Sequence, residues 1–342
     1  MKKAVELQRK IAPELLEIIE ARYNILRQIK YAQPVGRRTI AVALEIGERV
    51  VRAQVEFLKN AGLIGFSQLG MTITDEGQAV LSELDEYVRI MYGLSALEQT
   101  LAVRLGLKKV VVIRGDSETD SAVRRELGRA AAALLHEFLG HNKVVAVSGG
   151  STMAEVAQAI NFHAPEVTVV PARGGLGEVV EYQANTIAAV MANRLGGRYR
   201  LLHVPEGLSV EAMEVLGRDV NISAVTQMLK GAGVLLSGIG QAAAMALRRG
   251  ASPDIIQNLE ELGATGETFG HYCSLKGEVV YTSGGVGLHL DDLAGIRHVI
   301  AVAGGRNKAE AIVAVAAAGG QKVLVTDEAA ASAIQDIIKN QL

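Results

Sequence analysis

The chain has 342 residues, of which 49% are hydrophobic and 21% charged, and its formal net charge at pH 7 is -2. This length predicts two domains, and the composition is that of an ordinary globular protein. Cys273 is the single cysteine, which excludes an intrachain disulfide and a multi-cysteine zinc site. The sequence has no apolar run near the ~18 residues that cross a bilayer and no signal-peptide core, so we expect a cytoplasmic protein without a membrane partner.

Charge is distributed unevenly over the first ninety residues. Residues 22–59 hold eight cations against three anions, a net +5, whereas residues 60–90 hold one cation against five anions, a net -4. A basic block beside an acidic one indicates a local anionic partner for the first, and nucleic acid is the leading candidate.

Apolar residues at helical spacing predict three helices before residue 61, over residues 14–30, 38–44 and 48–60. Between the last two, Glu45 to Gly47 are expected to form a tight turn in which the glycine takes a positive φ. Two short helices joined in this way are the layout of a helix-turn-helix, whose second helix enters the major groove of DNA. The candidate DNA-contacting residues are Arg37, Arg38, Arg49, Arg52, Gln54 and Lys59.

These residues are expected to divide into two roles. Arg49 and Arg52 would each pair with a guanine and Gln54 with an adenine, if their rotation about the helix allows it. The other three cations would contact phosphates of double-stranded operator DNA. The alternative is that the basic face is simply solvated.

The segment "GLIGFSQLGMTITDEG" predicts a β-hairpin with strands at 63–66 and 71–74, followed by a helix from Thr74 or Asp75. Three helices and a hairpin make a winged helix, so residues 1–90 are expected to form a winged-helix DNA-binding domain with a linker helix. From Val80 to Leu105, apolar positions alternate in steps of four and three, interrupted at Glu98. This pattern indicates either a coiled-coil dimer seam or one face of a linker helix, and both remain open.

After residue 106, short β-branched segments alternate with helical ones. This texture predicts an α/β domain, residues 91–342, with a Rossmann-like, mainly parallel sheet covered on both faces. Ligands of such sheets bind at the carboxyl ends of the strands, so the functional loops should follow the strands. The expected strands lie within 109–115, 143–150, 167–175, 199–205, 233–240, 298–305 and 322–328.

The loop in "VSGGSTMAEVAQAI" has the chemistry of an anion site. A strand ending at Ser148 leads into Gly149, Gly150, Ser151 and Thr152, where a helix begins. The glycines let the backbone approach a ligand, the helix start attracts an anion, and the hydroxyls add donors. We expect a phosphate here, although no GK[ST] follows and a Walker A loop is excluded. The alternative is a capped turn that binds nothing.

Other strand-end loops supply cations. The "GGRNK" loop repeats the glycine pattern, and its Lys308 would neutralise the phosphate of the first loop if the two strands are adjacent. Arg173, Arg248 and Arg249 follow other strands and are candidates for a second anionic group.

Two rival functions remain open. Gly238-x-Gly240-x-x-Ala243 meets the loose dinucleotide fingerprint, which would indicate a nicotinamide-sensing regulator, but Glu260, at the required distance, lies in a helical run. A sugar-phosphate isomerase or deaminase would need a catalytic pair, and no spacing among the carboxylates marks one. The seven histidines show no metal-ligand spacing. We therefore expect no enzyme, no catalytic residues, no cofactor and no metal. The carboxylates considered are Glu267, Asp291, Asp292 and Asp327.

The stretches "VSGGSTMAEVA", "GETFGHYCSLKGEVV", "AVAGGRNKAEAIVAV" and "VLVTDEAAA" resemble the sugar-binding domain of the SorC family of bacterial transcription regulators, from about residue 92 to the end. That domain is related in fold to glucosamine-6-phosphate deaminases and ribose-5-phosphate isomerases. With its winged helix, the whole chain is similar to the members that repress glycolytic genes and respond to fructose-1,6-bisphosphate. The resemblance implies a homo-oligomer, a dimer or a tetramer on DNA.

The resemblance also implies roles for residues. The glycine loop and Lys308 would hold one phosphate, Arg173 and one arginine of the adjacent pair would lie near the sugar or a second phosphate, and Gln183 and Glu267 would contact hydroxyls. The related enzymes have "DGH" after "GIG", where this chain has "QAA", which favours a binding module. The implied effector-binding residues are Gly149, Gly150, Ser151, Thr152, Arg173, Gln183, Arg248, Arg249, Glu267 and Lys308.

Overall fold

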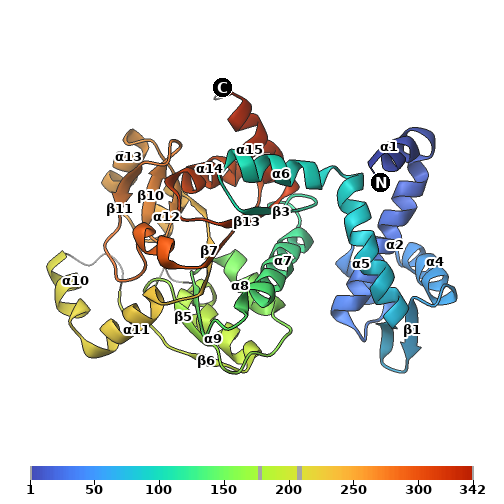
Figure 1. The fold of residues 1–342 in the computed structure, drawn as a ribbon, viewed down its shortest axis with the longest axis horizontal. Coiled ribbons are helices and arrows are strands. Elements are labelled where there is room, and N and C mark those ends of the chain that lie inside the picture. Colours follow the sequence, from blue (N-terminus) through green and yellow to red (C-terminus); the bar gives the residue numbers. More distant parts are fainter. Residues whose placement is uncertain (1, 176–178, 206–209, 341–342) are drawn as a thin grey trace. The chain divides into compact units, whose positions relative to one another are not determined.

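The computed structural model describes residues 2–175, 179–205 and 210–340. The chain divides into two compact units, Met1–Ala96 and Leu97–Leu342, called unit 1 and unit 2 below. Unit 1 consists of helices and one hairpin, and unit 2 alternates strands and helices (Figure 1). The predicted fold class, an N-terminal winged helix-turn-helix followed by a mainly parallel α/β domain, is confirmed.

Unit 1 is built around one apolar cluster to which every helix except the first contributes fully buried residues, among them Ile25, Ile40, Val51 and Leu81. The three predicted helices agree with the structure to within two residues, and each hairpin strand lies one residue from its expected position. The elements are α1 (Lys2–Ile11), α2 (Pro13–Ala32), α3 (Arg37–Ala43), α4 (Glu48–Asn60), β1 (Ile64–Ser67), β2 (Gly70–Ile73) and α5 (Asp75–Met91).

The turn between α3 and α4 corrects one expectation. Gly47 has φ -61° and ψ 137° and is the N-cap of α4, so the prediction of a positive φ at this glycine was wrong. The left-handed residue is Glu45, with φ 53°. The turn is closed by a hydrogen bond from the Ile46 N–H to the Ala41 carbonyl oxygen, 3.1 Å long. A single non-glycine residue visits this region at a cost of roughly 1–2 kcal/mol, which the surrounding packing offsets.

The wing is held to the chain that precedes α3. The N–H of Val35 donates to the Met71 carbonyl oxygen at 3.1 Å, and the N–H of Met71 donates back to Val35 at 2.9 Å. Gly70, with φ 141°, makes this close approach possible, because a Cβ atom there would lie 2.8 Å from the Val35 nitrogen. The hairpin therefore has a third, bridge-like partner.

Gly77 fixes the packing of α5 against the entrance of the hairpin. A Cβ atom at Gly77 would lie 2.0 Å from the carbonyl oxygen of Leu63. We expect Gly77→Ala to lower the local free energy of unfolding by about 2–3 kcal/mol, the cost of overpacking against backbone that cannot move freely. Native-state hydrogen exchange of the α5 and hairpin amides measures this loss. The matched control is Gly47→Ala, where the added Cβ meets nothing within 4 Å; equal losses in the two variants would contradict the packing argument.

The helix that was expected to continue to residue 105 is broken. α5 ends at Met91, Gly93 takes a left-handed φ of 69°, and α6 (Leu94–Arg104) begins afresh. Glu98, which interrupts the apolar pattern, is buried, and its Oε1 accepts a hydrogen bond of 2.6 Å from the N–H of Val112. Val112 lies in β3 (Lys109–Ile113), an edge strand whose outer amides have no neighbouring strand. Glu98, the polar residue in the apolar pattern, thus provides an acceptor for a backbone N–H at the edge of the sheet.

Unit 2 contains a seven-stranded sheet in the order β3-β13-β12-β7-β4-β5-β6, and all its ladders are parallel. The expected strand at 199–205 was wrong beyond its first residue, because the backbone N–H and carbonyl of Leu202 bond to the side chain of Asn185 instead of a strand. The other strands are β4 (Val144–Val147), β5 (Thr168–Pro171), β6 (Arg198–Tyr199), β7 (Val234–Gly238), β12 (His298–Val302) and β13 (Val323–Asp327).

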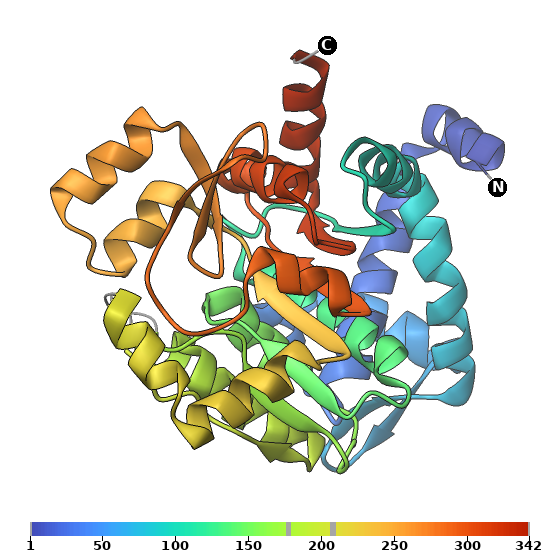
Figure 2. The same cartoon turned by 60° about the vertical axis from the view of Figure 1, so that its left-hand side comes forward.

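Helices cover both faces of this sheet, as predicted. Figure 1 and Figure 2 show α7, α8, α9 and α11 beside the strands of this sheet. Val145 and Val147 pack with α7, α8 and α9 in one cluster, whereas Ala146, which points the other way, packs with the end of α11 and with η2. The helices of unit 2 after α6 are α7 (Ser121–Leu139), α8 (Ser151–Ala159), η1 (Val180–Tyr182), α9 (Ala184–Leu195), α10 (Val210–Gly217), α11 (Val220–Lys230), α12 (Ala242–Arg248), α13 (Pro253–Glu261), η2 (Leu290–Gly295), η3 (Arg306–Lys308), α14 (Ala309–Ala318) and α15 (Glu328–Asn340).

A second, antiparallel sheet was not expected. It has the order β11-β10-β9-β8 and packs on α14, where a Cβ atom at Gly266 would lie 2.6 Å from the Ala311 carbonyl oxygen. Its strands are β8 (Gly240–Gln241), β9 (Ala264–Thr268), β10 (His271–Ser274) and β11 (Val279–Thr282). Among the described residues, no helix is both long and apolar enough to cross a membrane.

Candidate functional site

A cavity of about 190 Å³ lies where the strand order of the large sheet reverses. The chain runs outward from β4 to β5 and β6 and returns at β7, which pairs with β4 on its other side. Parallel α/β sheets bind ligands at such a point. β12 is separated from β4 by β7, so the condition that these two strands be adjacent is not met, yet Lys308 and the loop after β4 line the same cavity.

The loop after β4 is shaped by both of its glycines. A Cβ atom at Gly149 would lie 2.7 Å from the Tyr182 carbonyl oxygen, and Gly150 has φ 119° as the N-cap of α8. The loop is joined to β7 because the Gly238 N–H donates to the Ser148 hydroxyl at 2.9 Å. Ser151 and Thr152 line the cavity in the first turn of α8, where backbone N–H groups have no intrahelical acceptor. This arrangement suits an anion.

Lys308 also lines the cavity, from the short helix η3. Burial lowers the pKa of its ammonium group, and the neighbouring charges of Arg248 and Arg124 lower it further. The loop is held against β8 by a hydrogen bond of 2.7 Å from the Gln241 side chain to the Asn307 carbonyl oxygen. An anionic ligand would relieve the repulsion among these cations.

Asp327, one of the carboxylates considered as an acid or base, is fully buried and does not line the cavity. Its Oδ2 accepts hydrogen bonds from the N–H groups of Gly305 at 2.6 Å and Ser117 at 2.8 Å, and its Oδ1 accepts from Ala330 at 2.9 Å. The carboxylate therefore positions the loop that carries Lys308.

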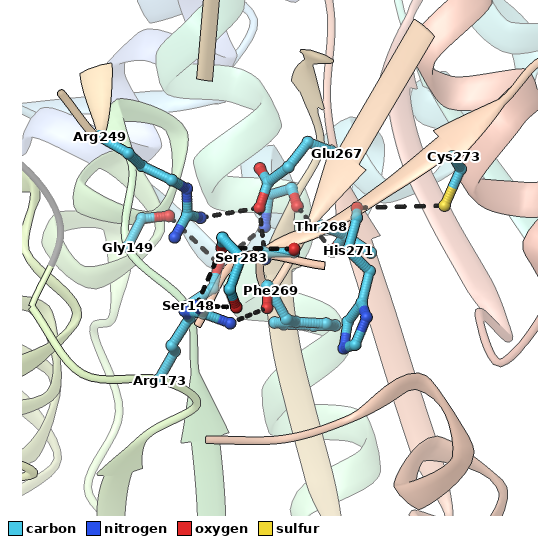
Figure 3. A network of polar contacts seen from close by, with 12 residues as sticks. Ser148, Gly149, Arg173, Arg249, Glu267, Thr268, Phe269, His271, Cys273 and Ser283 are labelled. Carbon is cyan, nitrogen blue, oxygen red and sulfur yellow. Dashed lines mark hydrogen bonds and ion pairs between the residues drawn. The ribbon is translucent and has the colours of Figure 1, made fainter. Parts of the chain in front are cut away.

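Arg248 and Arg249 both line the cavity but in different states. Arg249 forms a buried ion pair with Glu267, with 2.7 Å between Nη2 and Oε1 (Figure 3). The same Oε1 accepts from the Gly270 N–H at 2.6 Å. Arg248 is exposed and close enough to Lys308 to lower its pKa.

Arg173 is buried, and its guanidinium group donates to backbone carbonyls (Figure 3). Nη1 donates to the Phe269 carbonyl oxygen at 2.5 Å, and Nη2 donates to the carbonyl oxygens of Ser283 at 2.8 Å and Gly284 at 3.0 Å. Arg173 thus lines the cavity and also fixes the turn from β9 to β10. Gln183 is the N-cap of α9 and is not among the lining residues, and residues 176–178 of the same connection lie outside the described residues.

Some lining residues were not predicted. Ser148 and Gln241 stand in strand-end loops that the sequence already marked, so extending the same reasoning by one residue would have found them. Phe269 had no such signal, because it enters the cavity from the turn of the unexpected sheet, with φ 50°. Met245 reaches the cavity from α12 and fills the space beside Gly240.

The described lining residues carry four cations and one carboxylate, a net charge of +3. Such a charge suits a ligand with more than one negative group, since a cleft of one sign concentrates counter-ions. Within the described ranges no group of three or more His, Cys, Asp or Glu side chains could hold a metal ion. Glu260 lies inside α13 instead of at a strand end, which removes the acidic partner that a dinucleotide site needs. The charged lining residues are Arg173, Arg248, Arg249, Lys308 and Glu267.

The predicted DNA-contacting residues of unit 1 are exposed, with one exception. Gln54 is half-buried, and its Oε1 accepts a hydrogen bond of 3.0 Å from Arg22 Nε on α2. Gln54 lies about 140° around the helix from Arg49, on the side of α4 that meets Arg22, and its contact with an adenine stays a prediction. The exposed residues are Arg37, Arg38, Arg49, Arg52 and Lys59.

Comparisons with known proteins follow the same division of the chain. Residues 91–335 match the family model described as "Putative sugar-binding domain", and residues 18–88 match the CggR N-terminal DNA binding domain. The chain is 45% identical over 334 residues to the central glycolytic genes regulator of Priestia megaterium, covering 97% of this chain and 98% of that protein. A SorC family transcriptional regulator from Enterococcus faecalis is 39% identical, with a TM-score of 0.66, over 70% of this chain and 99% of that structure. The chain belongs to the SorC family of transcription regulators.

Other SorC-family structures extend the likeness to both units. The full-length sorbitol operon regulator SorC from Klebsiella pneumoniae shares the fold, with 20% identity and a TM-score of 0.66 over 92% of this chain and 98% of that one. The resemblance predicted from the sequence is therefore confirmed. As a member of this family, the chain is a transcription regulator that joins a DNA-binding domain to a sugar-binding domain.

Proposed function

We propose that this chain represses glycolytic genes and that a phosphorylated sugar, fructose-1,6-bisphosphate, modulates its binding to operator DNA. In this proposal residues 1–90 bind DNA and provide the linker, while residues 91–342 bind the effector and form the homo-oligomer, a dimer that can pair into a tetramer on DNA. The protein acts in the cytoplasm, as a regulator and not as an enzyme, without a metal or cofactor.

The observation that carries this proposal is the cavity with a net charge of +3 between the start of α8 and Lys308. A helix start and a half-buried ammonium group that line the same cavity suit one phosphate, and the remaining arginines provide for a second. The relatives named as central glycolytic genes regulators support the proposed regulation of glycolytic genes. Glu267 is the carboxylate among the described lining residues, and it is engaged in an ion pair with Arg249, which supports a binding role over catalysis.

Fluorescence anisotropy of a labelled DNA fragment from upstream of the gene's own operon tests the proposal. The protein is titrated onto the fragment with and without millimolar fructose-1,6-bisphosphate. We expect tight binding that weakens or loses cooperativity with the sugar, by a factor of about 5–150, the usual range of allosteric coupling. Binding that ignores the sugar would reject the effector, and no specific binding would reject the repressor.

Arg52, exposed on α4, is the residue that we expect to select the operator. Arg52→Ala should weaken operator binding by about 1–3 kcal/mol and affect random DNA less, because a bidentate contact to a base discriminates by that amount. Filter binding on both DNAs at fixed salt measures the difference. Lys59→Ala is the matched control from the same helix: it should weaken both DNAs alike and reduce the salt slope by ~1. Equal losses on both DNAs for Arg52→Ala would remove its proposed role.

A further inference from the structure

Glu98 is a buried carboxylate in α6, the helix that begins unit 2. It accepts the hydrogen bond from Val112 in the edge strand β3, and this bond fastens α6 to the large sheet. Burying a carboxylate costs free energy unless its oxygens accept hydrogen bonds, so the Glu98–Val112 contact holds α6 in one position on the sheet.

The carboxyl end of β3, where Val112 lies, leads into a connection that is tied to the loop that carries Lys308. The connection after β3 reaches Asp327 through the Ser117 N–H, and Asp327 also holds Gly305 of the Lys308 loop. A second link joins the same two segments, because the Asn307 side chain donates to Glu118 Oε1 at 2.7 Å. Movement of the Lys308 loop would therefore act on the segment that follows β3.

A third contact joins the connection after β3 to an arginine whose charge acts on Lys308. Arg124 donates from Nη2 to the Ser117 carbonyl oxygen at 3.0 Å, and its charge helps to lower the pKa of Lys308. β3 itself is a rigid link, since it pairs in parallel register with β13 over the whole of its length, from Lys109 to Ile113. The described residues thus connect the cavity wall to α6 through hydrogen bonds and the short backbone segments between them.

We propose that Glu98 is a positioning residue for allosteric coupling: it transmits the state of the effector cavity, through the connection after β3, to the helix that leads toward the DNA-binding unit. The inference rests on the proposed function. It assigns the coupling to one hydrogen bond that lies outside both binding sites. Loss of Glu98 should therefore change the effect of the sugar on DNA binding, but neither the affinity for the operator nor the affinity for the sugar.

The test measures three quantities for each variant of the full chain: operator affinity without sugar, affinity for fructose-1,6-bisphosphate, and the factor by which the sugar changes operator affinity. For Glu98→Ala we expect both affinities to stay within about threefold of wild type, while the coupling factor falls at least tenfold or to one. Glu98→Gln keeps an oxygen that can accept from Val112, so it should restore most of the coupling. A general structural defect would not be rescued in this way.

Glu118→Ala supplies a second test at an exposed position, where loss of folding is not expected. It removes the acceptor of Asn307 and should reduce the coupling factor by about threefold at unchanged affinity. Wild-type coupling in both alanine variants would overturn the proposal and leave the repressor function standing. If the wild-type chain itself showed no coupling, the proposed function would fail and this inference with it.

Discussion

Replacing Lys308 by glutamine is expected to weaken the binding of fructose-1,6-bisphosphate by a factor on the order of 100, while operator binding without sugar stays unchanged. A charge-assisted hydrogen bond contributes about 1.5–3 kcal/mol, and the glutamine removes both the charge and one of the donors of the ammonium group. Lys308 lies in unit 2, apart from the exposed cations of α3 and α4, so the DNA affinity has no reason to change. Isothermal titration calorimetry measures the sugar affinity directly.

The pH dependence of binding gives this prediction a second readout. Burial and the charge of Arg248 lower the pKa of Lys308 in the free protein, so part of its charge is lost below the ordinary lysine pKa of about 10.4. A bound phosphate stabilises the charged form, and affinity should therefore fall as the pH rises above neutrality, where the phosphate is already a dianion. In Lys308→Gln this decline should disappear.

Arg306→Gln is the matched control for this variant. Arg306 belongs to the same short helix but is exposed and does not line the cavity. It should keep both the affinity and the pH dependence. If it lost as much as Lys308→Gln, the general positive charge of the loop, and not the buried ammonium group, would account for binding.

Asp327→Asn is expected to lower the free energy of unfolding of unit 2 by about 4 kcal/mol, because a buried carboxylate with several hydrogen bonds is replaced by a group that cannot accept them all. Of the three N–H groups bound by Asp327, at least one would face the new amide donor. Thermal unfolding and urea titration measure the loss. Sugar binding should weaken as well, since the Lys308 loop loses its anchor.

Asp336→Asn, at an exposed position of α15, removes the same charge without breaking a buried contact. Its effect should stay within about 0.5 kcal/mol, the usual range for surface changes. Should Asp327→Asn prove as mild as this control, the three backbone hydrogen bonds would not be what holds the loop.

The two glycine loops that line the cavity were predictable because their pattern is local. Glycines at the end of a β-branched run, followed by hydroxyl residues and a helical pattern, define the loop and its suitability for an anion from a few neighbouring residues. Lys308 was found by the same rule, although the strands that carry the two loops are separated by β7. The carboxyl ends of parallel strands meet at one edge, so the rule does not need strict adjacency.

Other features depend on partners that are distant in sequence. The apolar pattern through Glu98 predicted a long helix, and only the edge strand, which needs an acceptor for its Val112 N–H, explains the polar residue. Likewise, residues 200–205 have strand-like composition, but the backbone N–H and carbonyl of Leu202 bond to the side chain of Asn185. Gly47 was assigned the positive φ by propensity, whereas the packing of α3 on α4 places it at Glu45.

The surroundings of Arg173 determine where this protein can be re-engineered as a biosensor for other sugars. A Cβ atom at Gly270 or Gly285 would lie within 2.6 Å of its guanidinium nitrogens, and one at Gly287 within 2.8 Å of its Cα atom. In a mutant library that varied these glycines, most variants would clash with Arg173 and disturb the cavity wall that it holds. Diversity is better placed at Ala244 and Met245 of α12, which reach the same cavity through side chains alone. New ligand specificity can thus be sought on one wall while the other keeps its shape.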